Sequence, residues 1–346
     1  FIALMGKLRL GLSIQLRITK IKIAIYSPNW IGDAVMSIPF VKEIKKEYPQ
    51  AEIYIICKDW VVGIFEHHQS INGTISFPLT KLKGIKNIIK TGLVLKSEKF
   101  DLSYTLTDSF RSAFILWISG AKKRVGFKTQ NRSLFLTDPI PVPIQIMHRS
   151  NKYLTLTKHK FIDQNSPQFF LLNHEKNWAK QKIKDFGLSS PTALLPFSVG
   201  EGRSLSISHI KKWIKNSKKD YLIFGSKNDA GSGISLETSC TENSIKSICG
   251  EFTLRESIAL INLCSSSIAT DSGLGHISAA LGTPTISFFG KGNSNVTAPK
   301  GLKTHVIQHC NPCFGDRCSQ EQGDLICIED ISCENVENTL KKLIEQ

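Results

Sequence analysis

The chain has 346 residues, 41% of them hydrophobic and 21% charged, and 44 Lys and Arg against 29 Asp and Glu give a net charge of +15. The length predicts about two domains of roughly 100–200 residues each, and the composition excludes disordered and collagen-like chains. No apolar stretch approaches the ~18–20 residues of a membrane-spanning helix, while the positive charge predicts an anionic partner: a nucleic acid, an acidic membrane surface or a phosphorylated substrate.

Residues 1–20 form a basic N-terminal extension without an acidic residue. The extension lacks the continuous apolar core and the small-residue cleavage site of a signal peptide. We expect either a segment upstream of a true start at Met5 or a basic arm that touches a membrane surface. The nine cysteines of the chain are too few and too scattered for a disulfide scaffold, which favours a cytoplasmic location.

Strands and helices alternate from residue 21 onward. The apolar run Ile21–Tyr26 predicts a strand, the spacing of apolar residues in Ala34–Tyr48 predicts a helix, and Ala51–Cys57 predicts a second strand. Together they form a βαβ unit. With further strands expected at Leu102–Thr107 and near Phe135, we assign residues 21–172 to a first domain.

The alternation resumes after a polar segment, residues 173–191, that we assign as a linker. The elements expected after it are Thr192–Pro196, Ile207–Lys218, Tyr221–Phe224, Leu254–Cys264, Ser267–Thr270, Gly275–Leu281 and Thr285–Phe289. They predict a second domain over residues 192–333. A C-terminal helix over residues 334–346 follows, and its expected inward residues are Val336, Leu340, Leu343 and Ile344. The predicted fold class is therefore α/β, with two facing Rossmann-like domains, parallel sheets and a cleft between them.

Ligands of open α/β sheets bind at the carboxyl ends of the strands. The loops at those ends span residues 27–33, 196–203, 225–229 and 270–276. Asp33 lies at a strand-to-helix junction, where a carboxylate serves either as a general base for a substrate hydroxyl or as a helix N-cap. The sequence allows both roles.

The segment Ile268–His276 carries the clearest local signal, because a buried strand ends at Asp271 and a helix follows. The amides of a helix N-terminus bind phosphate. His276 either donates to a phosphate or sugar oxygen or fills a structural position. Arg203 either forms bidentate hydrogen bonds to a diphosphate or is a solvated loop residue. Asp229 either binds a sugar hydroxyl or caps a helix.

Two basic stretches, Lys81–Lys99 and Lys122–Arg132, lie in the first domain. In the first stretch, one helical apolar stripe is expected, and the lysines lie elsewhere on the helix; the stripe consists of Leu82, Ile85, Ile88, Ile89 and Leu93. Aromatic residues are not interleaved with the basic ones as single-stranded nucleic acids require. The basic surface therefore favours an anionic lipid bilayer or a phosphorylated glycolipid and not a nucleic acid.

Cysteines gather near the C-terminus at Cys310, Cys313, Cys318 and Cys327. The first pair has the spacing of metal ligands, and four thiolates form a structural Zn²⁺ site in many proteins. The alternative is a set of reduced loop cysteines, and the single Cys-x2-Cys pair leaves both possibilities open.

From about Lys22 to the C-terminus, the chain resembles the lipopolysaccharide heptosyltransferases of Gram-negative bacteria, glycosyltransferase family 9. The motifs that carry the resemblance are Ser27–Asp33, Asp101–Ala113, Arg124–Phe127, Phe224–Ser226, Gly250–Leu254 and Asp271–Leu281. The resemblance implies the GT-B fold and an inverting transfer of heptose from ADP-heptose to a lipid A–Kdo–heptose type acceptor. It also implies that catalysis requires no cofactor and that the enzyme is peripheral on the inner face of the inner membrane. Asn29–Asp33, with its Trp, is closest to the enzymes that add the second heptose.

The resemblance also implies residue roles, with the acceptor in the first domain and the donor in the second. The catalytic base falls on Asp33. The implied donor-binding residues are Arg203, Asp229, Leu254, Asp271, Ser272, Gly273, Leu274 and His276. The expected acceptor-binding residues are Arg111, Lys122 and Arg124. Arg203 stands where the family has a phosphate-binding Lys, which replaces a point charge with a planar fork.

Two other functions fit the same residues. One is a GT-B glycosyltransferase that uses a different nucleotide sugar. The other is a non-catalytic protein that binds anionic glycolipids. Protection from unfolding by ADP-heptose but not by UDP-sugars would exclude the first, and turnover of the donor to ADP would exclude the second.

Overall fold

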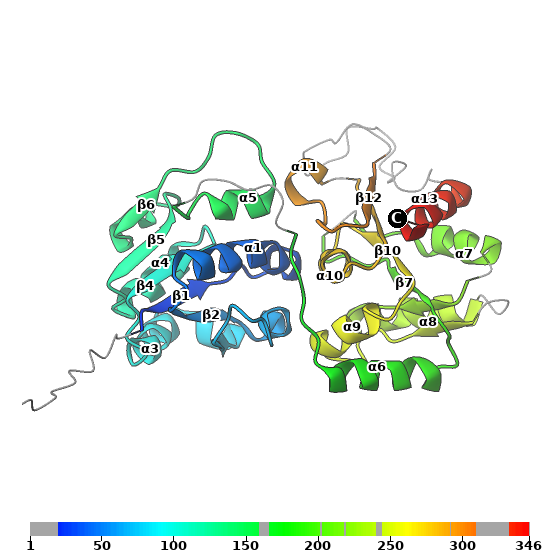
Figure 1. The fold of residues 1–346 in the computed structure, drawn as a ribbon, viewed down its shortest axis with the longest axis horizontal. Helices are drawn as coiled ribbons and strands as arrows, with labels where there is room; N and C mark the ends of the chain where they lie inside the picture. The colour runs from blue at the N-terminus through cyan, green and yellow to red at the C-terminus, as the bar shows by residue number, and fades with distance from the viewer. Residues whose placement is uncertain are drawn as a thin grey trace, which may run out of the picture.

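The computed structural model describes residues 20–158, 166–200, 203–217, 219–239, 244–290, 292–308 and 332–345. These residues form two lobes, each built on a six-stranded sheet (Figure 1). Every strand pairing within the described residues is parallel. The predicted fold of two Rossmann-like domains is confirmed.

The first lobe has the strand order β3-β2-β1-β4-β5-β6. Its strands are β1 (Lys22–Tyr26), β2 (Glu52–Lys58), β3 (Gly73–Phe77), β4 (Leu102–Thr105), β5 (Lys123–Phe127) and β6 (Asp138–Ile140). Its helices are α1 (Ile31–Glu47), α2 (Val62–Phe65), α3 (Ile85–Lys96), α4 (Phe110–Ile118) and α5 (Arg149–Leu154). The apolar run of β1 is fully buried from its second residue because helices cover both faces of a parallel sheet.

The second lobe repeats this order as β12-β11-β10-β7-β8-β9. Its strands are β7 (Thr192–Leu195), β8 (Tyr221–Ile223), β9 (Ile245–Ser247), β10 (Ser266–Thr270), β11 (Thr285–Phe288) and β12 (Thr304–Ile307). Its helices are α6 (Asn173–Asp185), α7 (Ile207–Asn216), α8 (Ala230–Ser239), α9 (Leu254–Ile261), α10 (Gly273–Leu281), α11 (Ser294–Thr297) and α13 (Cys333–Glu345). In both lobes the strand order reverses beside the first strand, which is where such sheets bind ligands.

The lobes meet where α1 packs against α10. A Cβ atom on Gly32 would lie 2.8 Å from the ring of His276, and one on Gly273 would lie 2.7 Å from the Cβ of Ile31. Because both positions are glycine, the N-terminal turns of the two helices approach closely. The loop before α1 and the loop before α10 therefore face the same space between the lobes.

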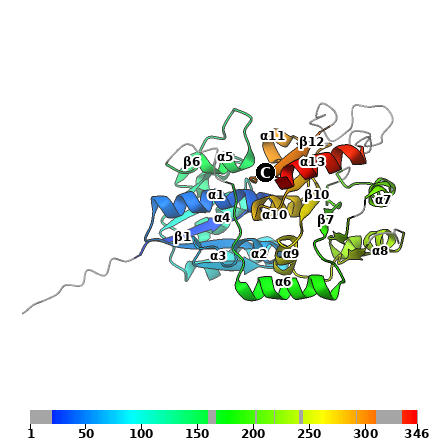
Figure 2. The ribbon, with the colours of Figure 1, turned by 45° about the vertical axis from the view of Figure 1, so that its right-hand side comes forward.

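The predicted linker, residues 173–191, contains α6, which packs on α9 (Figures 1 and 2). Of α6, only Ala179 and Ile183 are buried. Because most of the helix is exposed, its sequence is mostly polar, which explains its assignment as a linker. Its first turn is fixed by Glu175, which accepts from the Leu172 amide and pairs with Arg255 at 2.6 Å.

The predicted apolar stripe of α3 is only partly buried. Ile88 packs inward, but Ile85, Ile89 and Leu93 are 59%, 38% and 52% exposed. The face of α3 that packs on α4 is centred on Gly92, where a Cβ atom would lie 2.6 Å from the Cβ of Ile118. A small residue allows this close approach. With Gly92 facing α4, the side chains of Ile85, Ile89 and Leu93 lie in solvent.

The C-terminal helix is confirmed as α13, which packs against α7, β11 and β12. Val336, Leu340 and Leu343 are buried as predicted, whereas Ile344 is 45% exposed, so its predicted inward position is wrong. Among the helices of the described residues, none has the length and apolar character needed to cross a membrane.

Candidate active site

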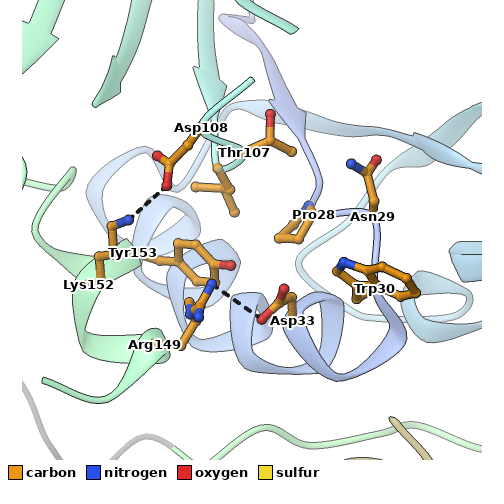
Figure 3. Close-up of a pocket in the computed structure, with 10 residues that line it drawn as sticks. Pro28, Asn29, Trp30, Asp33, Thr107, Asp108, Arg149, Lys152 and Tyr153 are labelled. Carbon is orange, nitrogen blue, oxygen red and sulfur yellow. Dashed lines mark hydrogen bonds and ion pairs between the residues drawn. The ribbon is translucent and has the colours of Figure 1, made fainter. Parts of the chain in front are cut away.

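A pocket opens at the carboxyl ends of β1 and β4, with α5 along one side (Figure 3). Its lining residues are Pro28, Asn29, Trp30, Asp33, Leu106, Thr107, Asp108, Arg149, Lys152 and Tyr153. The pocket thus joins the loop that carries the predicted base to the end of the motif segment Asp101–Ala113 and to α5, a helix that the sequence analysis did not predict.

Asp33 is the third residue of α1, and its side chain is 20% exposed. The N-cap of α1 is Trp30, which makes no side-chain cap bond, so the alternative that Asp33 is the N-cap is wrong. Burial raises the pKa of Asp33 above its ordinary value, and the positive charge of Arg149 partly opposes this shift. The Arg149 Nη1 atom lies 3.8 Å from Asp33 Oδ1. A partly desolvated carboxylate beside a cation is suited to accept a proton.

The sequence analysis missed the two cations of the pocket. Arg149 pairs with Asp33, and Lys152 Nζ lies 2.9 Å from Asp108 Oδ2 (Figure 3). Both come from α5, which has six residues and is too short to show a helical period. The available signal was the i, i+3 spacing of two basic residues, which places them on one helical face.

The sequence analysis also missed Arg132, which lies inside the predicted basic stretch but is fully buried. Its guanidinium donates to the carbonyls of Phe127 and Ser109, and an ion pair of 3.8 Å joins it to Asp108. Arg132 therefore fixes the loop after β4, which presents Asp108 to the pocket. Nothing in the sequence distinguishes this buried arginine from its solvated neighbours.

Replacing Arg149 by Met is expected to shift the acid limb of kcat/KM to higher pH. The group must be ionised to act as a base, so activity falls as the pH drops through the pKa of Asp33. Removing a cation that lowers this pKa lets it rise further. Lys122→Met is the matched control, since this cation lies at the other end of the sheet. If the acid limb of kcat/KM shifted equally in Arg149→Met and Lys122→Met, or shifted in neither variant, the coupling of Arg149 to Asp33 would be contradicted.

Two predicted donor-binding residues of the second lobe, Arg203 and Asp271, form an ion pair beside the N-terminus of α10. Arg203 Nη1 lies 3.1 Å from Asp271 Oδ2, and the side chains are 41% and 7% exposed. Burial raises the pKa of Asp271, and Arg203 opposes the shift. The charge of Arg203 also lowers the pKa of Asp33, so the pair and the predicted base share one electrostatic environment.

The N-terminus of α10 brings the rest of the predicted donor loop to this pair. Ser272 is the N-cap residue, and its buried Oγ has no hydrogen-bond partner among the described residues. Gly273 abuts α1, while Leu274 packs on the hydrophobic core. His276 lies at the lobe interface against Gly32, and burial lowers its pKa to about 3. The imidazole is therefore neutral at physiological pH.

Asp229 and Leu254 have structural contacts of their own. The Asp229 carboxylate accepts from the amide and the hydroxyl of Ser226, at 2.7 and 2.6 Å, so it takes the capping alternative through Oδ2. Leu254 begins α9 and packs on the hydrophobic core. Neither contact brings a ligand-binding atom into the pocket lined by Asp33.

None of the three predicted acceptor residues is among the residues that line this pocket. Arg111 lies in the first turn of α4, at the carboxyl edge of the sheet. Lys122 precedes β5 at the opposite edge and pairs with Asp101 at 2.8 Å. Arg124 donates to the carbonyls of Phe135 and Ala121. Strand direction explains the position of Lys122, because a residue that precedes a parallel strand lies at the edge of the sheet opposite the pocket.

The predicted zinc ligands Cys310, Cys313, Cys318 and Cys327 lie outside the described residues. Within the described part of the chain, no group of three or more His, Cys, Asp or Glu side chains is arranged to hold a metal ion.

Comparison with known proteins decides the family. The sequence profile of glycosyltransferase family 9 (heptosyltransferase) matches residues 88–323, which is more than half of the chain. The chain belongs to glycosyltransferase family 9. It is therefore a glycosyltransferase, and the enzyme class expected from the sequence is confirmed.

Relatives of this family 9 enzyme include the lipopolysaccharide heptosyltransferase 2 of Escherichia coli K12. The two are 26% identical over 313 residues, which is 83% of this chain and 88% of the relative. The lipooligosaccharide heptosyltransferase 2 of Campylobacter jejuni serotype O:2 is 24% identical over 94% of this chain and 98% of its own. The solved structure of E. coli ADP-heptose LPS heptosyltransferase II matches with a TM-score of 0.81 at 24% identity, over 94% of this chain and 99% of that one. This likeness supports the fold.

Proposed function

We propose that this family 9 enzyme transfers heptose from ADP-heptose to the inner core of lipopolysaccharide, adding the second heptose. The observation that carries the proposal is the partly desolvated carboxylate of Asp33 in a pocket with two cations, close enough to the Arg203–Asp271 pair of the second lobe for Arg203 to lower the pKa of Asp33. The relatives named heptosyltransferase 2 support the choice of reaction.

The proposed reaction is a single displacement with inversion. Asp33 accepts the proton of the acceptor heptose hydroxyl, whose oxygen forms a bond to the anomeric carbon of the donor. The bond from that carbon to the diphosphate breaks on the opposite face, and ADP leaves with the electron pair. Arg203 and the amides at the N-terminus of α10 stabilise the negative charge of the departing diphosphate. Closure of the two lobes excludes water that would hydrolyse the donor.

The cations of α5 support an anionic acceptor. Arg149 is 35% exposed and Lys152 22%, and both side chains line the pocket beside Asp33. An acceptor that carries phosphate and carboxylate groups gains charge-assisted hydrogen bonds from such groups. We propose Arg149 and Lys152 as acceptor-binding residues, together with Arg111 at the same edge of the sheet.

Incubation with ADP-heptose and a set of truncated core acceptors, with mass measurement of the products, tests the proposal. The expected product gains one heptose only on acceptors that already carry the first heptose. Thermal protection by ADP and ADP-heptose, but not by UDP-sugars, is expected in parallel. Protection by another nucleotide sugar would support the alternative donor, and the absence of any turnover would support the non-catalytic glycolipid-binding alternative.

We also propose that the enzyme is peripheral on the anionic inner face of the inner membrane. The exposed Ile85, Ile89 and Leu93 form one stripe along α3, and Lys86 and Lys90 lie beside them. A helix that presents apolar residues flanked by lysines fits the boundary of an anionic bilayer. The surface-charge contribution amounts to about 1 kcal/mol per Lys and is screened by salt.

Binding to vesicles that contain anionic lipid is therefore expected to weaken steeply with salt. Ile89→Ser combined with Leu93→Ser should reduce binding, because it removes the apolar contact. Ile234→Ser is the matched control, since Ile234 is 57% exposed on α8 of the other lobe. Salt-insensitive binding, or equal loss in the control, would contradict this docking face.

For the cofactors, we propose that transfer needs no added metal and that Cys310, Cys313, Cys318 and Cys327 hold a structural zinc ion. Metal analysis of the purified protein should then find about one zinc per chain, and chelation should lower the melting temperature. A metal-free preparation that is stable and active would refute the zinc site. Activity restored only by added divalent metal would refute metal-independent transfer.

A further inference from the structure

His148 links the two lobes through its imidazole ring. The residue immediately precedes α5 and is 8% exposed. Its Nδ1 accepts from the Ser150 amide at 3.2 Å, and its Nε2 lies 2.9 Å from the carbonyl oxygen of Ala298 in the second lobe. Because Nδ1 is an acceptor, the ring proton resides on Nε2 and is donated to Ala298.

Ala298 belongs to a segment that also contacts the donor loop. It follows α11, and six residues earlier Gly292 lies so close to Asp271 that a Cβ atom there would be 2.6 Å from Oδ2. Asp271 is the partner of Arg203. Residues 292–298 therefore run from the contact with this pair to the carbonyl oxygen that His148 contacts.

In the first lobe, His148 caps the short helix α5. α5 has six residues, and the bond from Ser150 to the ring satisfies one of its free N-terminal amides. The first residue of this helix is Arg149, and the fourth is Lys152, both in the acceptor pocket. A short helix has few internal hydrogen bonds, so its cap has a large share in fixing these two side chains.

We propose that His148 is a positioning residue that couples the donor-side segment 292–298 to the acceptor-side cations Arg149 and Lys152. The neutral ring makes one hydrogen bond to each lobe: Nε2 donates to the Ala298 carbonyl of the second lobe, and Nδ1 accepts from the Ser150 amide of α5. Occupation of the donor site then sets the position of the acceptor-binding side chains. The acceptor part of this inference rests on the proposed function, whereas the link between the lobes does not.

Two substitutions separate the two bonds. His148→Asn keeps a short acceptor for the Ser150 amide, because Asn is a good N-cap, but it does not reach Ala298. His148→Gln places a donor near the position of Nε2 but lacks the geometry of a good N-cap. A purely structural role would make both variants alike, with a lower melting temperature and little change in kinetics.

Hydrogen exchange of the full-length protein gives the first readout. Without ligand, His148→Asn should speed exchange in residues 292–298 and leave α10 unchanged. With ADP, wild-type α5 should exchange more slowly, and His148→Asn should lose this protection while its Kd for ADP stays within about threefold of the wild-type value. Coupling between sites is reciprocal and commonly amounts to 5- to 150-fold. We therefore expect the KM for the acceptor to rise about tenfold in His148→Asn and to rise less in His148→Gln.

Unchanged exchange in residues 292–298 of His148→Asn would overturn the link between the lobes, whether or not ADP binds. Retained ADP protection of α5 together with a wild-type KM would overturn the coupling. A wild-type protein that does not bind ADP would instead contradict the proposed function, and the ligand-free exchange would still decide the link.

Discussion

Replacing Asp33 by Asn is expected to lower turnover ~10²–10⁴-fold while folding and ADP binding stay near wild type. Asn keeps the size of the side chain but does not accept the proton of the attacking hydroxyl. Asp33 makes no capping bond, so the substitution removes no cap from α1. Melting temperature, affinity for ADP and turnover of donor with acceptor measure the three parts of this prediction.

The matched control is Asp108→Asn, because Asp108 is the other carboxylate that lines the pocket. It pairs with Lys152, is 42% exposed and lies on the far side of the two cations. We expect a smaller loss of turnover, mainly as a higher KM for the acceptor. If Asp33→Asn retained nearly wild-type turnover and Asp108→Asn lost it, the base would be Asp108, and the assignment of Asp33 would fail.

Replacing Arg203 by Ala is expected to weaken ADP binding by roughly 10- to 150-fold, since losing a charge-assisted contact costs ~1.5–3 kcal/mol. Turnover should fall as well, because the leaving diphosphate loses a cation. The structure adds a second effect. Asp271 is 7% exposed and loses its counter-charge, so its pKa rises further and it takes up a proton more readily.

The double variant Arg203→Ala with Asp271→Asn separates these effects. If Arg203 binds the diphosphate, the loss of ADP affinity persists in the double variant. If Arg203 only neutralises Asp271, the neutral Asn restores both stability and affinity. Isothermal titration with ADP and thermal unfolding of the single and double variants give the answer, and full recovery of affinity would remove Arg203 from the donor site.

Local sequence patterns determined the architecture. The alternation of apolar strand-length runs with helical spacing, repeated on both sides of residue 173, was sufficient for two parallel α/β lobes, because only a βαβ connection joins adjacent parallel strands efficiently. The same patterns placed Asp33 and the Asp271–His276 loop after strands β1 and β10. The carboxyl ends of parallel strands converge at one edge of each sheet, and the loops before α1 and α10 lie together because these two helices pack against each other.

Contacts between distant segments of the chain determine the orientation of α3 and the surroundings of the basic residues. The orientation of α3 depends on Gly92 fitting against Ile118, a contact between helices that no local periodicity encodes. Lys122 and Arg149 are both basic residues of the first lobe. Lys122 precedes β5 and pairs with Asp101, whereas Arg149 lies on α5, lines the pocket and pairs with Asp33.

Local patterns in the sequence were sufficient to place the Asp33 carboxylate after the first strand of the first lobe. The charges that surround this carboxylate depend on how distant segments of the chain pack together. Arg149 is more than a hundred residues from Asp33, and Ala298 is a further 149 residues along the chain. Charges shift a pKa through distance in space and through burial, neither of which is fixed until the lobes are packed.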